Sequence, residues 1–213
     1  MPASPTRVFE NGLDSLFRQY SAQLRRDAGR RTRGKLPKLT RPKLRKRIDR
    51  LVGIAAQYEL KKHGKRRFTD ATIEKRQWHV KRGKGWGLAA KKKTFAKWYD
   101  RAVHGRSCVY VFWKGRQCIY VGRTGAGGRR PQAHFEKYWF SPVSRIDLYI
   151  IRGKRQLPMA ECLAIHLFNP AKNKVKSAQQ KWRSNCPVCA KEVHIRKMLT
   201  TMFPLKRRRR RAV

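Results

Sequence analysis

Among the residues that could do chemistry, one carboxylate stands out, that of Glu161. The chain has 213 residues, with 55 Lys and Arg against 12 Asp and Glu, and a formal net charge of +43. Glu161 interrupts an apolar run whose pattern predicts a helix opened by Pro158. A buried carboxylate is costly unless it is paired or binds a metal. Because so basic a chain suits a polyanion, Glu161 indicates a metal ion held beside a bound phosphate.

The elements that must position Glu161 begin with two β runs. Cys108-Val-Tyr-Val-Phe-Trp and Gln117-Cys-Ile-Tyr-Val-Gly flank a Lys-Gly-Arg turn, which predicts a hairpin. A Gly-rich loop, a helix from about 131 to 138, a strand at 146–151 and the helix with Glu161 follow. The order β-β-α-β-α predicts the fold class α+β.

This stretch resembles the GIY-YIG endonucleases over about residues 107 to 175. The first half of the motif stands as Cys108-Val109-Tyr110, with Cys108 where the family usually has Gly, and the second as Tyr120-Val121-Gly122. The remaining family positions are filled, in chain order, by Arg130, His134, Glu161, Pro170 and Asn173. The resemblance implies metal-dependent hydrolysis of phosphodiester bonds in DNA, with a single metal ion and a tyrosine as base.

Elementary chemistry suits each implied role. Glu161 would hold one Mg²⁺ or Mn²⁺, a hard cation that takes oxygen ligands. Arg130 would grip the phosphate as a planar fork, although Arg129 beside it is equally suited by sequence. Tyr110 or Tyr120 would contact the attacking water, with a nearby cation favouring phenolate character.

Two further residues complete the expected catalytic set. His134, one helical turn after Arg130, would relay a proton or hold a phosphate. Asn173 would orient backbone or substrate. We expect the neighbouring cations to bind DNA phosphates, which position a nucleic acid without reading its sequence; these cations are Arg123, Arg129, Lys172 and Lys174.

The chain divides by composition into three regions. Residues 1–105 predict a basic, largely helical nucleic-acid-binding region, with helices at about 1–25, 43–62 and 88–103 and a flexible arm near 25–45. A helix start is also expected near Thr69 or Asp70. Residues 106–178 form the expected GIY-YIG-like nuclease domain. Residues 179–213 are a C-terminal extension with a CxxC motif and an Arg-rich tail.

The CxxC motif, Cys186 and Cys189 with His194 behind it, predicts a candidate structural Zn²⁺ site. The fourth ligand stays open among His166, Cys162 and His63. Five cysteines, an odd count, favour reduced thiols over a disulfide framework.

The partner expected from the charge is DNA, with RNA second. No run approaches the roughly 18 to 20 apolar residues of a membrane span, and the N-terminus lacks a signal peptide core. We therefore expect an intracellular, nucleic-acid-associated protein, in the cytoplasm or nucleoid, or in a eukaryotic nucleus. One catalytic unit cuts one strand, so a double cut would need a dimer on DNA or successive events. The alternative is a catalytically inactive or RNA-directed nucleic-acid-binding protein.

Overall fold

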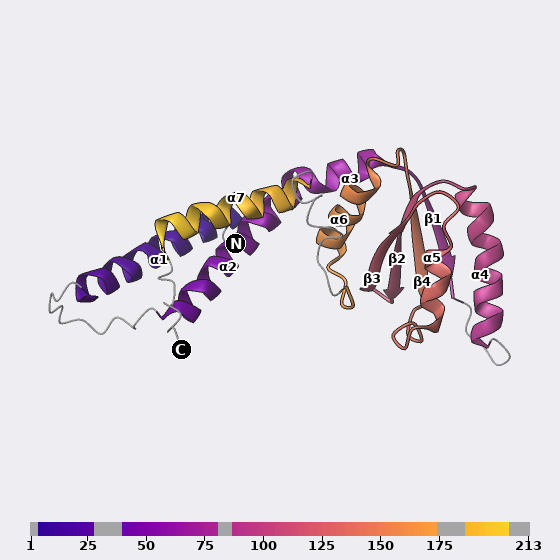
Figure 1. Cartoon of the computed structure of the whole chain (residues 1–213), viewed down its shortest axis with the longest axis horizontal. Coiled ribbons are helices and arrows are strands. Elements are labelled where there is room, and N and C mark those ends of the chain that lie inside the picture. Colours follow the sequence, from indigo (N-terminus) through magenta and orange to yellow (C-terminus); the bar gives the residue numbers. More distant parts are fainter. Residues whose placement is uncertain (1–3, 28–39, 81–86, 174–185, 205–213) are drawn as a thin grey trace, which may run out of the picture. The chain divides into compact units, whose positions relative to one another are not determined.

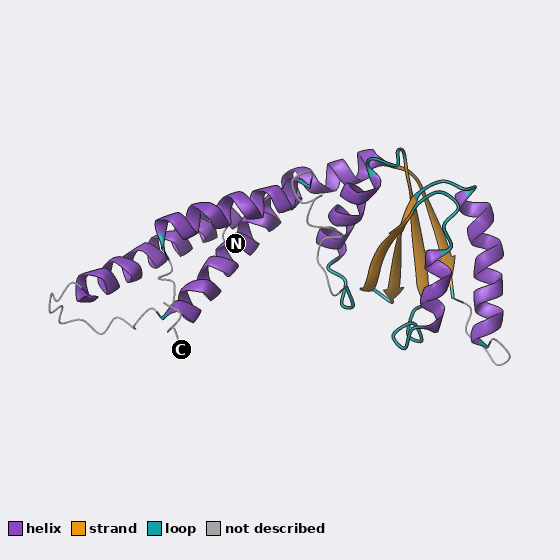
Figure 2. Ribbon diagram, viewed as in Figure 1, coloured by secondary structure: helices purple, strands orange, loops and turns teal. Residues whose placement is uncertain are grey.

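A computed structural model of the chain describes residues 4–27, 40–80, 87–173 and 186–204 (Figure 1). Its elements are, in chain order, α1 (Pro5–Asp27), α2 (Arg41–Glu59), a π-helical turn (Leu60–Gly64), α3 (Lys65–Ala71), β1 (Thr72–His79), α4 (Leu88–Val103), β2 (Cys108–Lys114), β3 (Gln117–Thr124), α5 (Arg130–Ala133), a 3-10 turn (His134–Glu136), β4 (Arg145–Ile151), α6 (Leu157–Phe168) and α7 (Pro187–Met202). This mixture of helices and an antiparallel sheet confirms the α+β class (Figure 2). Within the described ranges, no helix is both long and apolar enough to cross a lipid bilayer.

The chain forms two compact units, one of Met1–Lys61 with Val188–Val213 and one of Lys62–Pro187. Residues 62–105, which the sequence analysis placed with the N-terminal region, therefore belong to the unit that contains the sheet. In the first unit, α1, α2 and α7 share a core, which confirms the amphipathic helices expected there. Its buried residues are Leu16, Leu44, Ile48, Leu51, Val52, Ile195, Leu199 and Phe203.

The second unit is built on a four-stranded antiparallel sheet with the order β1-β4-β2-β3. The expected hairpin is present as β2 and β3, and its register places Tyr110 opposite Gly122. On the other side of β2, Tyr110 pairs with Leu148 of β4. The two halves of the motif thus lie on adjacent strands, as the sequence pattern predicts.

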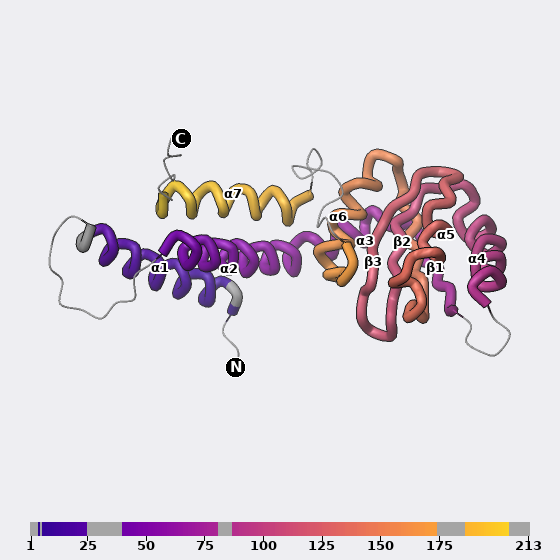
Figure 3. The backbone as a smooth tube through the Cα atoms, turned by 60° about the horizontal axis from the view of Figure 1, so that its bottom comes forward, coloured from indigo at the N-terminus to yellow at the C-terminus, as the bar shows by residue number. Residues whose placement is uncertain are grey.

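The sheet is packed on both faces because side chains alternate along each strand. One face carries Tyr110 and Phe112 of β2 and Leu148 of β4, which pack against Phe95 of α4 in one core. On the other face, the ring of Tyr149 stacks on that of Phe168 in α6, 5.9 Å between centroids. Two views show α6 and α4 on either side of the strands (Figures 1 and 3).

Strand β1 was not expected. The sequence analysis placed a helix start near Thr69 or Asp70, but α3 ends at Ala71 and β1 begins at Thr72. Residues 72–79 pair along their length with β4, which gives that strand a neighbour on each side. Long-range pairing of this kind overrides a local cap signal, so the helix prediction was wrong there.

The helix after the Gly-rich loop is shorter than expected. It was expected over about 131–138, but α5 ends at Ala133 and a 3-10 turn follows to Glu136. The rings of Phe135 and Phe140 stack 4.0 Å apart, and both are buried in the core under α4. Packing these two rings requires the chain to turn back instead of continuing as a helix.

Candidate active site and metal centre

The centre of the candidate active site is a buried pair, Tyr110 of β2 and His134 of the 3-10 turn. The Tyr110 side chain is fully buried, and its hydroxyl lies 2.9 Å from Nε2 of His134. Gly122 makes room for this hydroxyl, because a Cβ there would lie 2.5 Å from it. The glycine of the second half-motif is therefore required by the tyrosine of the first.

The imidazole of His134 is held neutral. Burial, followed by the positive charges of Arg130 and Lys137, lowers the pKa of His134 to about 4. A neutral imidazole has one donor and one acceptor nitrogen, so Nε2 can accept a hydrogen bond from the Tyr110 hydroxyl. The pair is therefore joined by a hydrogen bond inside the site.

The two motif tyrosines are neutral phenols. Burial raises the pKa of Tyr110 far above its ordinary value and raises that of Tyr120 as well, and the charge of Arg130 opposes this only in part. The phenolate character expected from a nearby cation is thus not favoured, because desolvation outweighs that cation. Tyr120 is less buried, and its ring centroid lies 4.7 Å from that of His134 and 5.2 Å from that of Trp139.

Glu161 lies on α6 and is buried, with 7% of its surface exposed. Its Oε2 lies 2.9 Å from Nε of Arg123, a residue expected from sequence only to bind DNA. Burial raises the pKa of Glu161 to about 6, and the charges of Arg123 and Arg130 limit that rise. The carboxylate is therefore ionised at neutral pH, within reach of two guanidinium charges.

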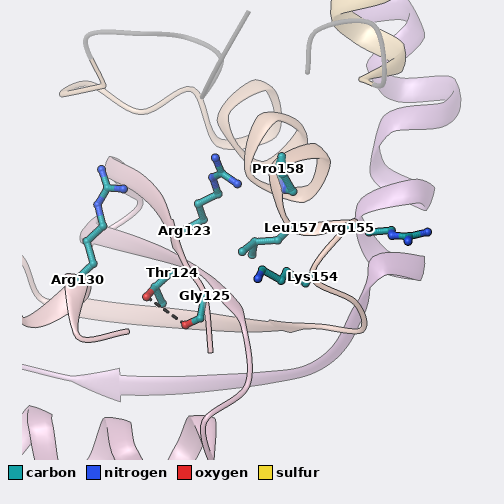
Figure 4. A pocket seen from close by; sticks show the side chains of 8 residues that line it. All are labelled: Arg123, Thr124, Gly125, Arg130, Lys154, Arg155, Leu157 and Pro158. Carbon is teal, nitrogen blue, oxygen red and sulfur yellow. Dashed lines mark hydrogen bonds between the residues drawn. The ribbon is translucent and has the colours of Figure 1, made fainter. Parts of the chain in front are cut away.

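The structure separates the two candidate arginines. Arg130 lines a cavity of about 650 Å³ (Figure 4). The other lining residues are Arg123, Thr124, Gly125, Lys154, Arg155, Leu157 and Pro158. Arg129 instead lines a second cavity of about 450 Å³ with Lys92 and Lys93 of α4. Of the two, Arg130 is the one whose charge acts on Tyr110, Tyr120, His134 and Glu161.

Asn173 binds backbone. Its Oδ1 accepts a hydrogen bond from the Val121 amide at 2.9 Å, and its Nδ2 donates to the Val121 carbonyl at 2.7 Å. Of the two roles left open by sequence, the geometry supports orientation of the backbone, since Val121 separates the motif residues Tyr120 and Gly122. Lys172 is exposed, with Nζ 5.5 Å from the ring centroid of Tyr138. Lys174 and the Arg-rich tail lie outside the described residues.

Tyr99 is a site residue that sequence reasoning missed. Its hydroxyl donates to the carbonyl of Gly128 at 2.9 Å and lies 3.9 Å from Sγ of Cys108. It thus ties α4 to the Gly-rich loop that leads to Arg130. The signal available in the sequence was its position four residues after Phe95, which predicts a shared buried face but no contact with the loop.

A second group of residues has the character of a metal centre. One ligand atom from each of Cys162, His166, Cys186 and Cys189 lies within 4.8 Å of every other, and this group could hold a metal ion such as zinc. The sequence analysis had paired the two CxxC cysteines with His194. The structure instead brings them to Cys162 and His166, both among the ligands left open, while His194 is exposed on α7.

Comparison of the chain with protein-family models, with curated proteins and with solved structures found no match.

Proposed function

We propose that the chain is a metal-dependent endonuclease that hydrolyses phosphodiester bonds in DNA through a GIY-YIG-type active site. The observation that supports this most is that Arg130 lines the basic cavity and that its charge acts on Tyr110, Tyr120, His134 and Glu161. These four residues come from β2, β3, the 3-10 turn and α6. An arrangement around one guanidinium is what a phosphate in transfer needs.

The basic cavity gives the phosphodiester a place to bind. It is lined by Arg123 of β3, Arg130 of α5, and Lys154 and Arg155 from the turn before α6 (Figure 4). Cations that line one concave surface stabilise phosphate oxygens and the charge that grows on them. The neutral Tyr110–His134 pair, joined at 2.9 Å, can hold and pass the proton released by the attacking water.

Glu161 fits a hard divalent cation. Its Oε2 is buried and contacts Arg123 but has no hydrogen bond of good geometry among the described residues. Mg²⁺ and Mn²⁺ prefer carboxylate oxygens and keep several waters, so one carboxylate beside a phosphate is a suitable donor set. Such an ion, when bound, neutralises charge on the phosphoryl group. Glu161 would hold it, and Arg123 would then shift its contact toward the phosphate.

The Arg123–Glu161 contact is also the observation that favours the inactive alternative. A guanidinium already neutralises this carboxylate, so the pair suits a protein that binds nucleic acid without cutting it. The two functions differ in one property, which is whether cleavage depends on a divalent ion and on Glu161.

The experiment is cleavage of supercoiled plasmid by the wild-type protein and by Glu161→Gln, with Mg²⁺, Mn²⁺ or EDTA at one fixed salt concentration. We expect metal-dependent nicking that falls at least about 100-fold in Glu161→Gln, since loss of a catalytic charge interaction has that size. Glu136→Gln is the matched control, because Glu136 is an exposed carboxylate that pairs with Lys92 on the surface.

Equal gel retardation of DNA by wild type and Glu161→Gln, without cutting by either, would overturn the nuclease proposal and leave the inactive alternative. Cleavage of RNA with none of DNA would replace the substrate. Cleavage measured over a range of protein concentrations also tests whether linear plasmid appears only at higher protein concentration, as a dimer on DNA requires.

A further inference from the structure

We propose that Cys162, His166, Cys186 and Cys189 bind one Zn²⁺ ion in a structural site that is separate from Glu161. Their ligand atoms all lie within 4.8 Å of one another. In a tetrahedral zinc site with Zn–S near 2.3 Å and Zn–N near 2.0 Å, ligand atoms are about 3.4 to 3.8 Å apart. The four groups thus need movements of about one ångström or less to surround an ion.

The ligands come from two local motifs that each suit a metal. Cys162 and His166 are four residues apart on α6, so both point to the same side of that helix. Cys186 immediately precedes α7 and Cys189 lies in its first turn, which is the CxxC spacing of a zinc knuckle. Four ligands from two motifs form a set that a chance approach of side chains rarely produces.

Burial and charge agree with this assignment. The three cysteines are buried, and His166 is half-buried at the edge of the group. Three thiolates, one neutral imidazole and one Zn²⁺ carry a net charge of about −1. In a chain of net charge +43, such a centre is electrostatically favoured. Sulfur and imidazole donors select zinc over Mg²⁺ or Ca²⁺, which prefer oxygen.

The site is structural because the protein fills all four positions and leaves none for a substrate or water. Its effect is on α6, where Cys162 directly follows Glu161. Zinc therefore fixes the helix that presents Glu161 toward Arg123. This last consequence rests on the proposed function, whereas the zinc site itself does not.

The test is the zinc content of the full-length protein, purified without chelators and measured by atomic emission together with the protein concentration. We expect one Zn²⁺ per chain, released when the thiols react with a mercurial reagent. Replacement by Co²⁺ should give the intense sulfur-to-metal charge-transfer band of a tetrahedral thiolate site. These readouts need no cleavage activity, so they stand or fall apart from the nuclease proposal.

Variants identify the ligands. Cys162→Ser and Cys186→Ser should each lose most of the bound zinc, while His166→Cys should keep it because a fourth thiolate completes the same tetrahedron. His194→Ala is the matched control and should keep one zinc, as should Cys118→Ser, a buried cysteine of β3 outside the group. Retention of zinc by His166→Cys also shows that a substituted site still folds.

Three results would overturn the proposal. The first is protein that contains no zinc and gives no thiolate band with Co²⁺. The second is undiminished zinc in both Cys162→Ser and Cys186→Ser. The third is a Cys186–Cys189 disulfide, found by mass spectrometry in protein alkylated before unfolding, which would make the pair a redox group instead.

Discussion

The hydroxyl of Tyr110 lies 2.9 Å from Nε2 of His134, and both side chains are buried. A buried polar atom is costly unless it has a partner. The Tyr110 hydroxyl and Nε2 of His134 satisfy each other, whereas the buried Nδ1 of His134 has no hydrogen-bond partner among the described residues. Since burial keeps the phenol and the imidazole neutral, the contact is a hydrogen bond between neutral groups.

We expect Tyr110→Phe and His134→Gln each to lower plasmid cleavage by about 100-fold or more, the usual size of acid–base catalysis. Because the two residues act as a unit, the double variant should be scarcely slower than either single one. Single-turnover cleavage rates under saturating protein measure this. Tyr138→Phe, at an exposed ring, is the control. Effects that multiply in the double variant would show that the two residues act independently.

Gly122→Ala should damage the same pair without touching its polar atoms. A Cβ at this position would lie 2.5 Å from both Cζ and the hydroxyl of Tyr110, which is fully buried and has no space to retreat. We expect a loss of about 1 to 3 kcal/mol in the free energy of unfolding, the usual cost of overpacking, together with loss of cleavage. Urea unfolding measures the first.

Gly87→Ala is the control for that substitution, because nothing lies within 4 Å of its Cβ position and its φ is −63°. If Gly122→Ala proves as stable and active as Gly87→Ala, then Tyr110 does not occupy the space that Gly122 leaves.

The hairpin and the Glu161 helix were predictable from sequence, because alternating and helical apolar patterns are local. The partners of Glu161 and of the CxxC motif were not. The sequence analysis predicted Arg123 as a DNA-binding residue and His194 as a zinc ligand, because each lies close in the sequence to the residues with which it was grouped. Only the packing of α6 against β3 brings Arg123 to Glu161, and that contact has no local signature.

Strand β1 shows the same limit in the fold. Its residues alternate too little for a strand signal, and its pairing with β4 joins segments about seventy residues apart, as in the Gln77–Asp147 hydrogen bond. The choice between Arg129 and Arg130 was likewise beyond sequence, because neighbouring residues at a helix start diverge by about 100° and only the fold decides which faces the site.

That choice gives a third prediction. Arg130→Gln should abolish cleavage while plasmid retardation remains. Binding loses only one of many positive charges, whereas catalysis loses the guanidinium that would stabilise the phosphate. Arg129→Gln removes the same charge one residue away, beside Lys92 and Lys93, and should weaken binding slightly at low salt while leaving the cleavage rate at saturation unchanged. The reverse pattern would assign the catalytic role to Arg129.

His134 also makes stability depend on pH. Its pKa is about 4 in the folded protein against an ordinary 6.5, so between these values the unfolded chain binds a proton that the folded chain does not. Stability therefore falls as pH drops from about 6.5 to 4, by roughly 3 kcal/mol at about 1.4 kcal/mol per pKa unit. The groups around the imidazole are two cations, Arg130 and Lys137, and the two neutral motif tyrosines. The cations disfavour protonation of the imidazole, and the tyrosines carry no charge that would favour it.

The measurement is the free energy of unfolding in urea at pH 7 and pH 4.5 for wild type and His134→Gln. Carboxylates titrate in both proteins, so the difference between the two pH dependences isolates His134. We expect the wild type to lose more stability on acidification than the variant does. Parallel losses would mean that His134 has an ordinary pKa in the folded state.

Asn173→Ala tests the link between the segment that follows α6 and strand β3. The side chain of Asn173 makes two hydrogen bonds with the backbone of Val121. The neighbouring side chain of Lys172 is exposed and, among the described residues, makes no hydrogen bond to β3. Loss of the Asn173 side chain leaves the Val121 amide and carbonyl without those partners, at a cost of about 1 to 3 kcal/mol.

Because this cost is local, hydrogen exchange at the Val121 amide is the direct measurement, with Lys172→Ala as control. We expect faster exchange at Val121 in Asn173→Ala alone, with a smaller loss of cleavage than Arg130→Gln causes, since Asn173 acts through the strand and not on the phosphate. Unchanged protection of the Val121 amide in Asn173→Ala would show that the strand holds its position without Asn173. If cleavage were lost while that protection stayed intact, Asn173 would contact the substrate instead of orienting the backbone.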